Sequence, residues 1–206
     1  MSKILESIKN LKGKPSEIPD VGRNDLPEFF VEMGYKTIVE IGVYRADFTE
    51  VLAKSGLQIY GVDPWLAYTG YPYNSDPKTQ QRMDEYYKLS LKKMAYYPNC
   101  TILKESSMEA VKHFEDSSLD GVYIDGNHSF RYIAEDLCEW SKKVKKGGII
   151  AGHDYIYGNP VHFHVRFVLE AYIEAFGIKN FWVLGRKHPD EGEMRDEWRS
   201  WMFFNK

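Results

Sequence analysis

The sequence predicts an α/β fold in which a mostly parallel β-sheet carries helices on both faces. Short apolar, β-branched runs alternate with helical patterns over the first 150 residues, and this alternation is typical of parallel strands joined by crossover helices. The chain has 206 residues, which is enough to bury a substantial core. We therefore divide it into an N-terminal lead-in, residues 1–24, and one domain, residues 25–206.

Seven strands are expected, each from an apolar run with glycine, proline or polar residues at its ends. The five strands of the alternating part are expected at 37–42, 58–63, 101–105, 120–125 and within 147–155. The runs FWVLG and SWMFF, residues 181–185 and 200–204, are the last two, and we expect them to pair antiparallel.

The helices follow from capping residues and from helical patterns. Asn24 can cap the first helix of the domain, with Pro27 in its first turn and Gly34 near its end. Residues 64–77, rich in tyrosine, proline and glycine, are predicted to form a loop. Other helices are expected in the lead-in and at 47–56, 79–97, 107–114, 130–144 and 161–176.

The composition excludes several classes of partner. The net charge of −3 provides no general basic field for nucleic acid, so we expect no nucleic-acid partner. No apolar run approaches the roughly 20 residues that span a bilayer, and the N-terminus lacks the apolar core of a signal peptide, so we expect no membrane partner. Two cysteines are too few for a disulfide framework, which favours a cytoplasmic location. A homodimer stays open, because the sequence does not determine the oligomeric state.

The functional site is expected at one edge of the sheet. Parallel sheets bind ligands beyond the carboxyl ends of their strands. Three of the five segments that follow the predicted strands contain an aspartate near the strand end, and a fourth contains a glutamate. The five segments are 42–47, 63–65, 105–107, 125–128 and 153–155.

The first of these segments argues against a dinucleotide. A dinucleotide turn needs several glycines so that the backbone can approach a pyrophosphate, whereas VEIGVYRADF contains only Gly42. Asp47 and Glu40 add negative charge, which suits a cationic sulfonium better than a pyrophosphate. Asp63, at the end of the second strand, can accept hydrogen bonds from both hydroxyls of a ribose. This last feature is shared by both kinds of adenosine cofactor.

Four segments, VEIGVYRADFTEVLA, YGVDPW, GVYIDGNHSFRYIAEDLCEW and VKKGGIIAGHDY, resemble class I S-adenosylmethionine-dependent methyltransferases. The similarity covers residues 25–205 and is greatest to the small-molecule branch with macrolide-sugar O-methyltransferases and cephalosporin-hydroxylase-like proteins, the methyltransferase domain 24 type. It implies a Rossmann-like seven-stranded sheet ending in a hairpin, with S-adenosyl-L-methionine as cofactor.

The resemblance also implies roles for individual residues. Glu40 and Gly42 would line the methionine part of the cofactor, and Asp63 would bind its ribose. Ser106 or Ser107 would lie near the adenine. Trp65, in the YGVDPW segment, is assigned to the same cofactor site. The family usually has a second glycine in the first turn, where this chain has Ala46. A structural explanation stays open for each: Asp63 and Ser107 can cap helices, and Glu40 can be paired in the core.

The chemistry is expected at Asp125, His128, His153 and Asp154. An alcohol, with a pKa near ~16, must lose its proton to accept a methyl group, and a histidine or a bound cation can assist. Adjacent strand ends lie about 4.8 Å apart, so Asp125 and Asp154 can share one cation. The resemblance implies that Asp125, His153 and Asp154 hold magnesium and that His128 is the base. His153 stands where the family more often has a carboxylate, and a neutral imidazole suits Mn²⁺, Fe²⁺ or Zn²⁺ better than Mg²⁺.

The sequence therefore predicts an O-methyltransferase that acts on a hydroxyl of a small polyhydroxylated acceptor, a sugar or other carbohydrate. Trp65, Tyr68, Tyr71 and Tyr73 are candidates for an aromatic wall on which a sugar stacks, or merely cover the sheet. Two alternatives stay open: a catechol-like phenol as acceptor, and a non-catalytic cofactor-binding domain of the same fold. His128 can also cap a helix, and His153 can be a buried core residue.

Overall fold

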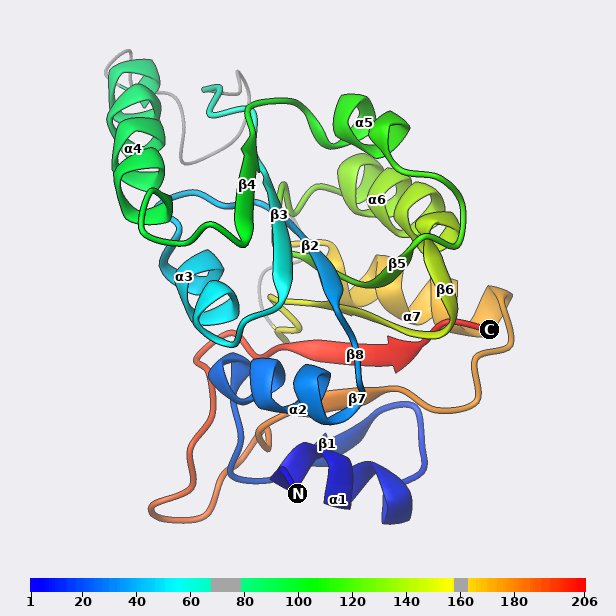
Figure 1. Ribbon diagram of the computed structural model, residues 1–206. Coiled ribbons are helices and arrows are strands. Elements are labelled where there is room, and N and C mark those ends of the chain that lie inside the picture. The colour runs from blue at the N-terminus through cyan, green and yellow to red at the C-terminus, as the bar shows by residue number, and fades with distance from the viewer. Residues whose placement is uncertain (68–78, 158–162) are drawn as a thin grey trace.

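One sheet organises the computed structural model, which describes residues 1–67, 79–157 and 163–206 (Figure 1). Its strands are β1 (Ser16–Ile18), β2 (Thr37–Ile41), β3 (Gln58–Val62), β4 (Cys100–Leu103), β5 (Leu119–Ile124), β6 (Val144–Gly152), β7 (Trp182–Leu184) and β8 (Trp201–Phe204). Their order across the sheet is β1-β7-β8-β6-β5-β2-β3-β4. All neighbours are parallel except at β8, which is antiparallel to both β6 and β7. The predicted Rossmann-like α/β fold with a C-terminal hairpin is confirmed.

The helices lie close to their predicted positions and are shorter at their ends. They are α1 (Lys3–Asn10), α2 (Leu26–Glu32), α3 (Asp47–Lys54), α4 (Thr79–Met94), α5 (Ser107–Ala110), α6 (Phe130–Lys143) and α7 (Val165–Ala175), with 3₁₀ turns η1 (Arg23–Asp25) and η2 (Val111–His113). None of the helices in the described ranges is long and apolar enough to cross a bilayer.

The lead-in adds an eighth strand, where the sequence predicts seven. β1 pairs parallel with β7, and Ile18 in β1 is fully buried. Ile4 of α1 is fully buried as well and packs in the same cluster as Leu26 of α2. The lead-in and the domain therefore share one core. β1 was missed because the three residues SEI show neither an apolar run nor an alternating pattern.

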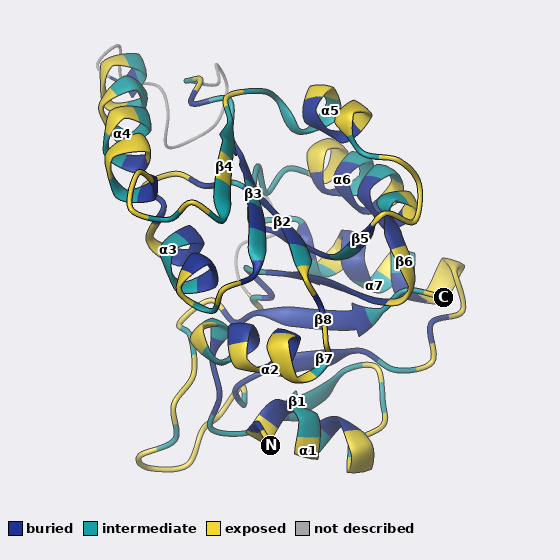
Figure 2. Ribbon diagram, in the orientation of Figure 1, coloured by how far each residue is buried: buried dark blue, intermediate teal, exposed yellow. Residues whose placement is uncertain are grey.

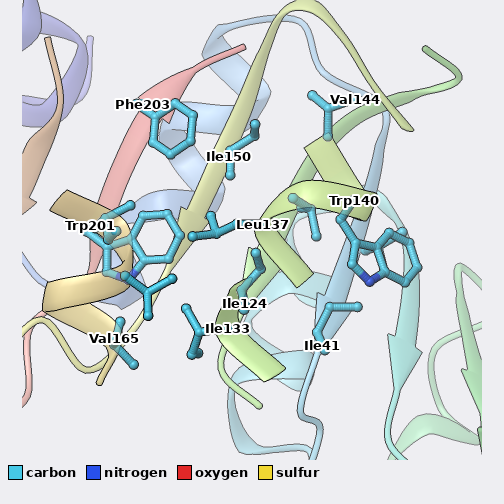
Figure 3. Packing of buried hydrophobic residues seen from close by; sticks show 14 of the residues in the cluster. Ile41, Ile124, Ile133, Leu137, Trp140, Val144, Ile150, Val165, Trp201 and Phe203 are labelled. Carbon is cyan, nitrogen blue, oxygen red and sulfur yellow. The ribbon is translucent and has the colours of Figure 1, made fainter. Parts of the chain in front are cut away.

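The two faces of the sheet are covered by different helices. Side chains alternate along β2, so that Ile38 packs with α1, α2 and α3, while Val39 and Ile41 pack with α5, α6 and α7. Figure 3 shows the second cluster, in which Ile133 and Leu137 of α6 lie against the sheet. Figure 2 shows that the strands in the middle of the sheet are mostly buried, whereas the edge strand β4 and the outer helix faces are more exposed. The rigid sheet fixes the loops at its carboxyl edge, where the candidate site lies.

Candidate active site

The turn after β2 is held close to the neighbouring strand end by Gly42. This residue has a φ of +93°, and an added Cβ would lie 2.1 Å from the carbonyl oxygen of Asp125. Only glycine fits this position. Two further residues of the turn, Tyr44 and Ala46, have φ values of +53° and +57°. Ala46, at the position where the family usually has glycine, thus adopts the left-handed conformation despite its side chain, at a cost of about 1–2 kcal/mol.

Glu40 lies buried in β2, directly before this turn. Its side chain is 2% exposed, and its Oε2 atom has no hydrogen-bond partner among the described residues. Burial raises the pKa of the Glu40 carboxyl to about 8. A buried carboxyl with an unused acceptor is suited to a cationic ligand group that approaches the turn.

Asp63 joins the turns that follow β2 and β3. One oxygen of its carboxylate accepts a hydrogen bond from the Tyr44 N–H at 2.8 Å, and the other accepts one from the Trp65 N–H at 2.7 Å. Each carboxylate oxygen can accept a second hydrogen bond, so the group can still bind a diol. The Trp65 ring is 1% exposed, packs 4.8 Å from the ring of Tyr87, and donates from Nε1 to the Tyr44 carbonyl. Trp65 therefore supports the turn from within.

The serines after β4 have structural partners. Ser106 caps α5, and its N–H and hydroxyl both donate to Glu109. The Ser107 hydroxyl accepts from Trp140 Nε1 at 2.7 Å and donates to Asp136. Burial raises the pKa of the Asp136 carboxyl to about 7. Both serines follow β4, the neighbour of β3, at the carboxyl edge of the sheet.

Three of the four residues predicted for the chemistry form one cluster beyond β5 and β6. Nε2 of His128 lies 2.7 Å from Oδ2 of Asp154 and 3.9 Å from Oδ1 of Asp125. The ligand atoms of these three residues all lie within 4.8 Å of one another, so the group can hold a metal ion. The histidine of this cluster is His128, whereas the sequence analysis placed His153 with the two carboxylates as a metal ligand. Nδ1 of His153 lies 3.6 Å and 3.9 Å from Asp154 and Asp125.

A comparison with protein families decides the class. A family model described as a methyltransferase domain matches residues 39–155, more than half of the chain. The chain belongs to this methyltransferase family. The predicted membership of a methyltransferase family is thus confirmed, and the matched range contains the turn of Gly42, Asp63 and the cluster beyond β5 and β6.

Solved structures share the fold of this methyltransferase. The O-methyltransferase TomG of Streptomyces achromogenes, in complex with S-adenosylmethionine, superposes with a TM-score of 0.61 and 12% identity over 89% of this chain and 79% of its own. An O-methyltransferase of Bacillus cereus, in complex with S-adenosylhomocysteine, superposes with a TM-score of 0.59. It is 13% identical over 89% of this chain and 80% of its own. An uncharacterised protein of Sinorhizobium fredii, y4gI, is 21% identical over 154 residues, which are 72% of this chain and 15% of that protein. The methyltransferase therefore spans a small part of this relative's length.

The charge state of His128 depends on the two carboxylates beside it. Burial disfavours the imidazolium, but the hydrogen bonds with Asp125 and Asp154 outweigh it and raise the pKa of His128 to about 10. The same contacts hold the pKa of Asp154 well below its usual range, despite burial. Burial and repulsion by Asp154 raise the pKa of Asp125, although His128 and His153 oppose this. Without a bound cation, the methyltransferase holds His128 protonated at neutral pH.

This ion pair predicts a pH-dependent stability. The pKa of His128 is about 10 in the folded protein against an ordinary value of 6.5, so its contribution is fully present below pH 6.5 and is lost as the pH rises through about 10. We expect His128→Asn to lower the free energy of unfolding of the chelator-treated protein most near pH 6 and least near pH 10. Urea denaturation of both proteins across this range measures it. A difference that is constant or grows with pH would contradict the ion pair.

A pocket opens beside the cluster and contains residues that the sequence analysis missed. Its volume is about 270 Å³, and it is lined by Arg23, His153, Asp196, Glu197 and Trp198. Arg23 comes from η1, and the last three come from the segment between β7 and β8. Their sequence signal was weak, because none follows one of the five strands that the sequence predicted for the alternating part of the chain. Tyr68, Tyr71 and Tyr73 of the predicted aromatic wall lie outside the described residues.

Gly42→Ala tests the packing of the turn. Gly34 provides a matched control, because it also has a left-handed φ, +76°, but has no atom within 4 Å of an added Cβ. Both substitutions are expected to cost about 1–2 kcal/mol from backbone strain. Gly42→Ala should cost about 1–3 kcal/mol more through overpacking and should weaken S-adenosylhomocysteine binding. Urea denaturation and calorimetric titration measure the two effects; equal losses in both variants would contradict the close approach.

Proposed function

We propose that this methyltransferase transfers the methyl group of S-adenosylmethionine to a hydroxyl of a small polyhydroxylated acceptor, a sugar. The observation that carries the proposal is the partly buried cluster of Asp125, His128 and Asp154, which lies between the turn of Gly42 and the pocket. The turn meets the Asp125 backbone, and His153 and Arg23 of the pocket lie 3.9 Å and 3.5 Å from the Asp125 carboxylate. Donor and acceptor can thus meet at one carboxylate.

On the donor side, Glu40 and Gly42 are assigned to the methionine part of S-adenosylmethionine. The unused Oε2 atom of Glu40 suits the cationic end of that ligand. Asp63 is assigned to the ribose, and Ser106 and Ser107 to the edge of the adenine site. The solved O-methyltransferase of Bacillus cereus, in complex with S-adenosylhomocysteine, shares this fold and supports the choice of cofactor.

The donor set of the cluster fits a divalent cation. The two carboxylates lie within 4.8 Å of each other and of the His128 imidazole, and as a two-ligand set they leave positions open for an acceptor. Asp125 and Asp154 are the residues that would hold the ion, with His153 near both. When bound, the ion lowers the pKa of a hydroxyl that coordinates it.

The proton of the acceptor hydroxyl is assigned to His128. A histidine accepts a proton only in its neutral form, and the carboxylates that favour the imidazolium here are the ones assigned to the cation. Neutralisation of their charge therefore favours the form of His128 that acts as a base. Asp154, 2.7 Å from Nε2, then orients the imidazole or shares its proton.

The acceptor class follows from the size and lining of the pocket. About 270 Å³ is just below the usual range for ligand sites, roughly 300–1,000 Å³, and suits one ring. Trp198 is 37% exposed and packs edge-on against Phe163, which stacks on His128. An exposed indole beside polar groups suits the apolar face of a sugar ring. A catechol also offers adjacent oxygens and remains the second candidate.

A screen of glycosides and catechols with a donor that carries a labelled methyl group tests the proposal. Transfer to a ring hydroxyl of one or more glycosides is expected. Transfer confined to catechols would reject the sugar acceptor and keep the O-methyltransferase. Binding of S-adenosylhomocysteine without transfer to any acceptor would favour a non-catalytic cofactor-binding domain.

A further inference from the structure

Arg23 brings a positive charge to the pocket from outside residues 39–155, the range that the methyltransferase family model matches. It lies in η1, 173 residues before Asp196, to which its backbone N–H donates at 2.5 Å. Its guanidinium lies over the ring of Phe48 at 5.6 Å, and one third of its side chain is exposed. The side chain therefore lines the pocket from a fixed position.

The guanidinium of Arg23 has unused donors. Its one side-chain hydrogen bond within the described part of the chain is from NH1 to Asp125 Oδ2, and at 3.5 Å it is long. A guanidinium carries five N–H donors. No Arg23 nitrogen is both buried and without a hydrogen-bond partner. The N–H groups that make no hydrogen bond are therefore accessible to solvent. Arg199, by contrast, is 3% exposed and bonds the Glu17 carboxylate and the Gly185 carbonyl.

The acids of the same pocket are less available. Oδ2 of Asp196 accepts from the Arg23 N–H and from the Ser200 hydroxyl, and it faces Nε2 of His153 at 4.0 Å. Glu197 is exposed. The pocket therefore combines partnered or solvated acids with a cation that has free donors.

We propose that Arg23 binds an anionic substituent, a carboxylate or a phosphate, on the acceptor ring. The planar fork of a guanidinium matches both groups in a bidentate manner. The acceptor is then an acidic sugar, whose ring lies against Trp198 and whose hydroxyl reaches Asp125. This inference rests on the proposed function, which names a sugar, and adds the charge of the acceptor.

The test measures binding of glucuronate, glucose 6-phosphate and glucose to the methyltransferase in the presence of S-adenosylhomocysteine. At least one acidic sugar is expected to bind tenfold or more tightly than glucose, and the stronger of the two identifies the anion. Arg23→Gln is expected to weaken that binding about 10- to 150-fold, as for hydrogen bonds to a charged group. Its affinity for glucose and for S-adenosylhomocysteine should stay within about twofold of the wild type.

Arg186→Gln is the matched control, because Arg186 pairs with Asp190 and Glu193 outside the pocket. Arg23→Lys keeps the positive charge but not the planar fork, so its affinity for the acidic sugar should lie between those of the wild type and Arg23→Gln. It replaces Arg23→Gln in the test if that variant does not fold. Equal binding of glucose and both acidic sugars, or full affinity in Arg23→Lys and Arg23→Gln, would overturn the inference. Methyl transfer to neutral sugars alone, unaffected by Arg23→Gln, refutes the inference but not the proposed function. Binding of an acidic sugar that depends on Arg23 but leads to no methyl transfer refutes the proposed function but not the inference.

Discussion

Replacing His128 by alanine is expected to reduce kcat by about 10²- to 10⁴-fold, the usual contribution of a general base. His128 is the one imidazole of the described chain with a ring nitrogen 2.7 Å from the Asp154 carboxylate, and the other two members of the cluster are carboxylates. The affinity for S-adenosylhomocysteine should change little, because His128 lies on the acceptor side of the site. Steady-state kinetics with the best glycoside and calorimetric titration measure the two quantities.

His113→Ala is the control for this substitution, because His113 pairs with Glu105 at the surface and lies outside the cluster. The same experiment separates the two acceptor classes. A phenol, with a pKa near ~10, needs about six units less help than an alcohol, or roughly 8 kcal/mol. Activity that is confined to catechols and survives His128→Ala would contradict the sugar acceptor.

Removal of divalent ions is expected to lower turnover at least 100-fold, since a Lewis acid at a reacting oxygen contributes several kcal/mol. The affinity for S-adenosylhomocysteine should stay within about twofold, because Glu40, Asp63 and the turn of Gly42 do not belong to the cluster. Chelation followed by titration with Mg²⁺ and with Mn²⁺ measures both effects and identifies the preferred ion.

Asp154→Asn provides a second test of the cation. It should lose activity that no concentration of the ion restores, because Asp154 is 3% exposed and lies at the centre of the cluster. Full turnover of the wild type in excess chelator would show that His128 works without an ion. The assignment of Asp125 and Asp154 as ligands would then be wrong.

The meeting of Asp125 and Asp154 could be predicted from the sequence. Both follow runs that are recognisable as buried parallel strands, and such strands bring their carboxyl ends to one edge. The structure pairs Ile124 with Gly152, so Asp125 lies beside His153, one residue before Asp154, and the two carboxylates come within 4.8 Å of each other. The alternation of strands with helices along the chain also predicted helices on both faces of the sheet.

The direction of side chains and the remote contacts could not be predicted. His128 and His153 both follow strand ends, and the backbone conformation decides which ring enters the cluster; Asp154 adopts a left-handed φ of +62° there. Arg23 and Asp196 meet because β1 and β8 add to the same sheet from opposite ends of the chain. No local pattern encodes such a contact. The prediction of a metal-ligand role for His153 stays untested.

Calorimetric titration of S-adenosylhomocysteine against the wild type, Asp63→Ala and Asp63→Asn tests most directly the central claim, that the turns after β2 and β3 bind the methyl donor. The wild type should bind S-adenosylhomocysteine and not NAD. Asp63→Ala should lose about 1.5–3 kcal/mol of binding free energy, the value of charge-assisted hydrogen bonds, and Asp63→Asn less. Circular dichroism shows whether each variant is folded. Unchanged affinity in a folded Asp63→Ala variant, or tighter binding of NAD to the wild type, would contradict the claim.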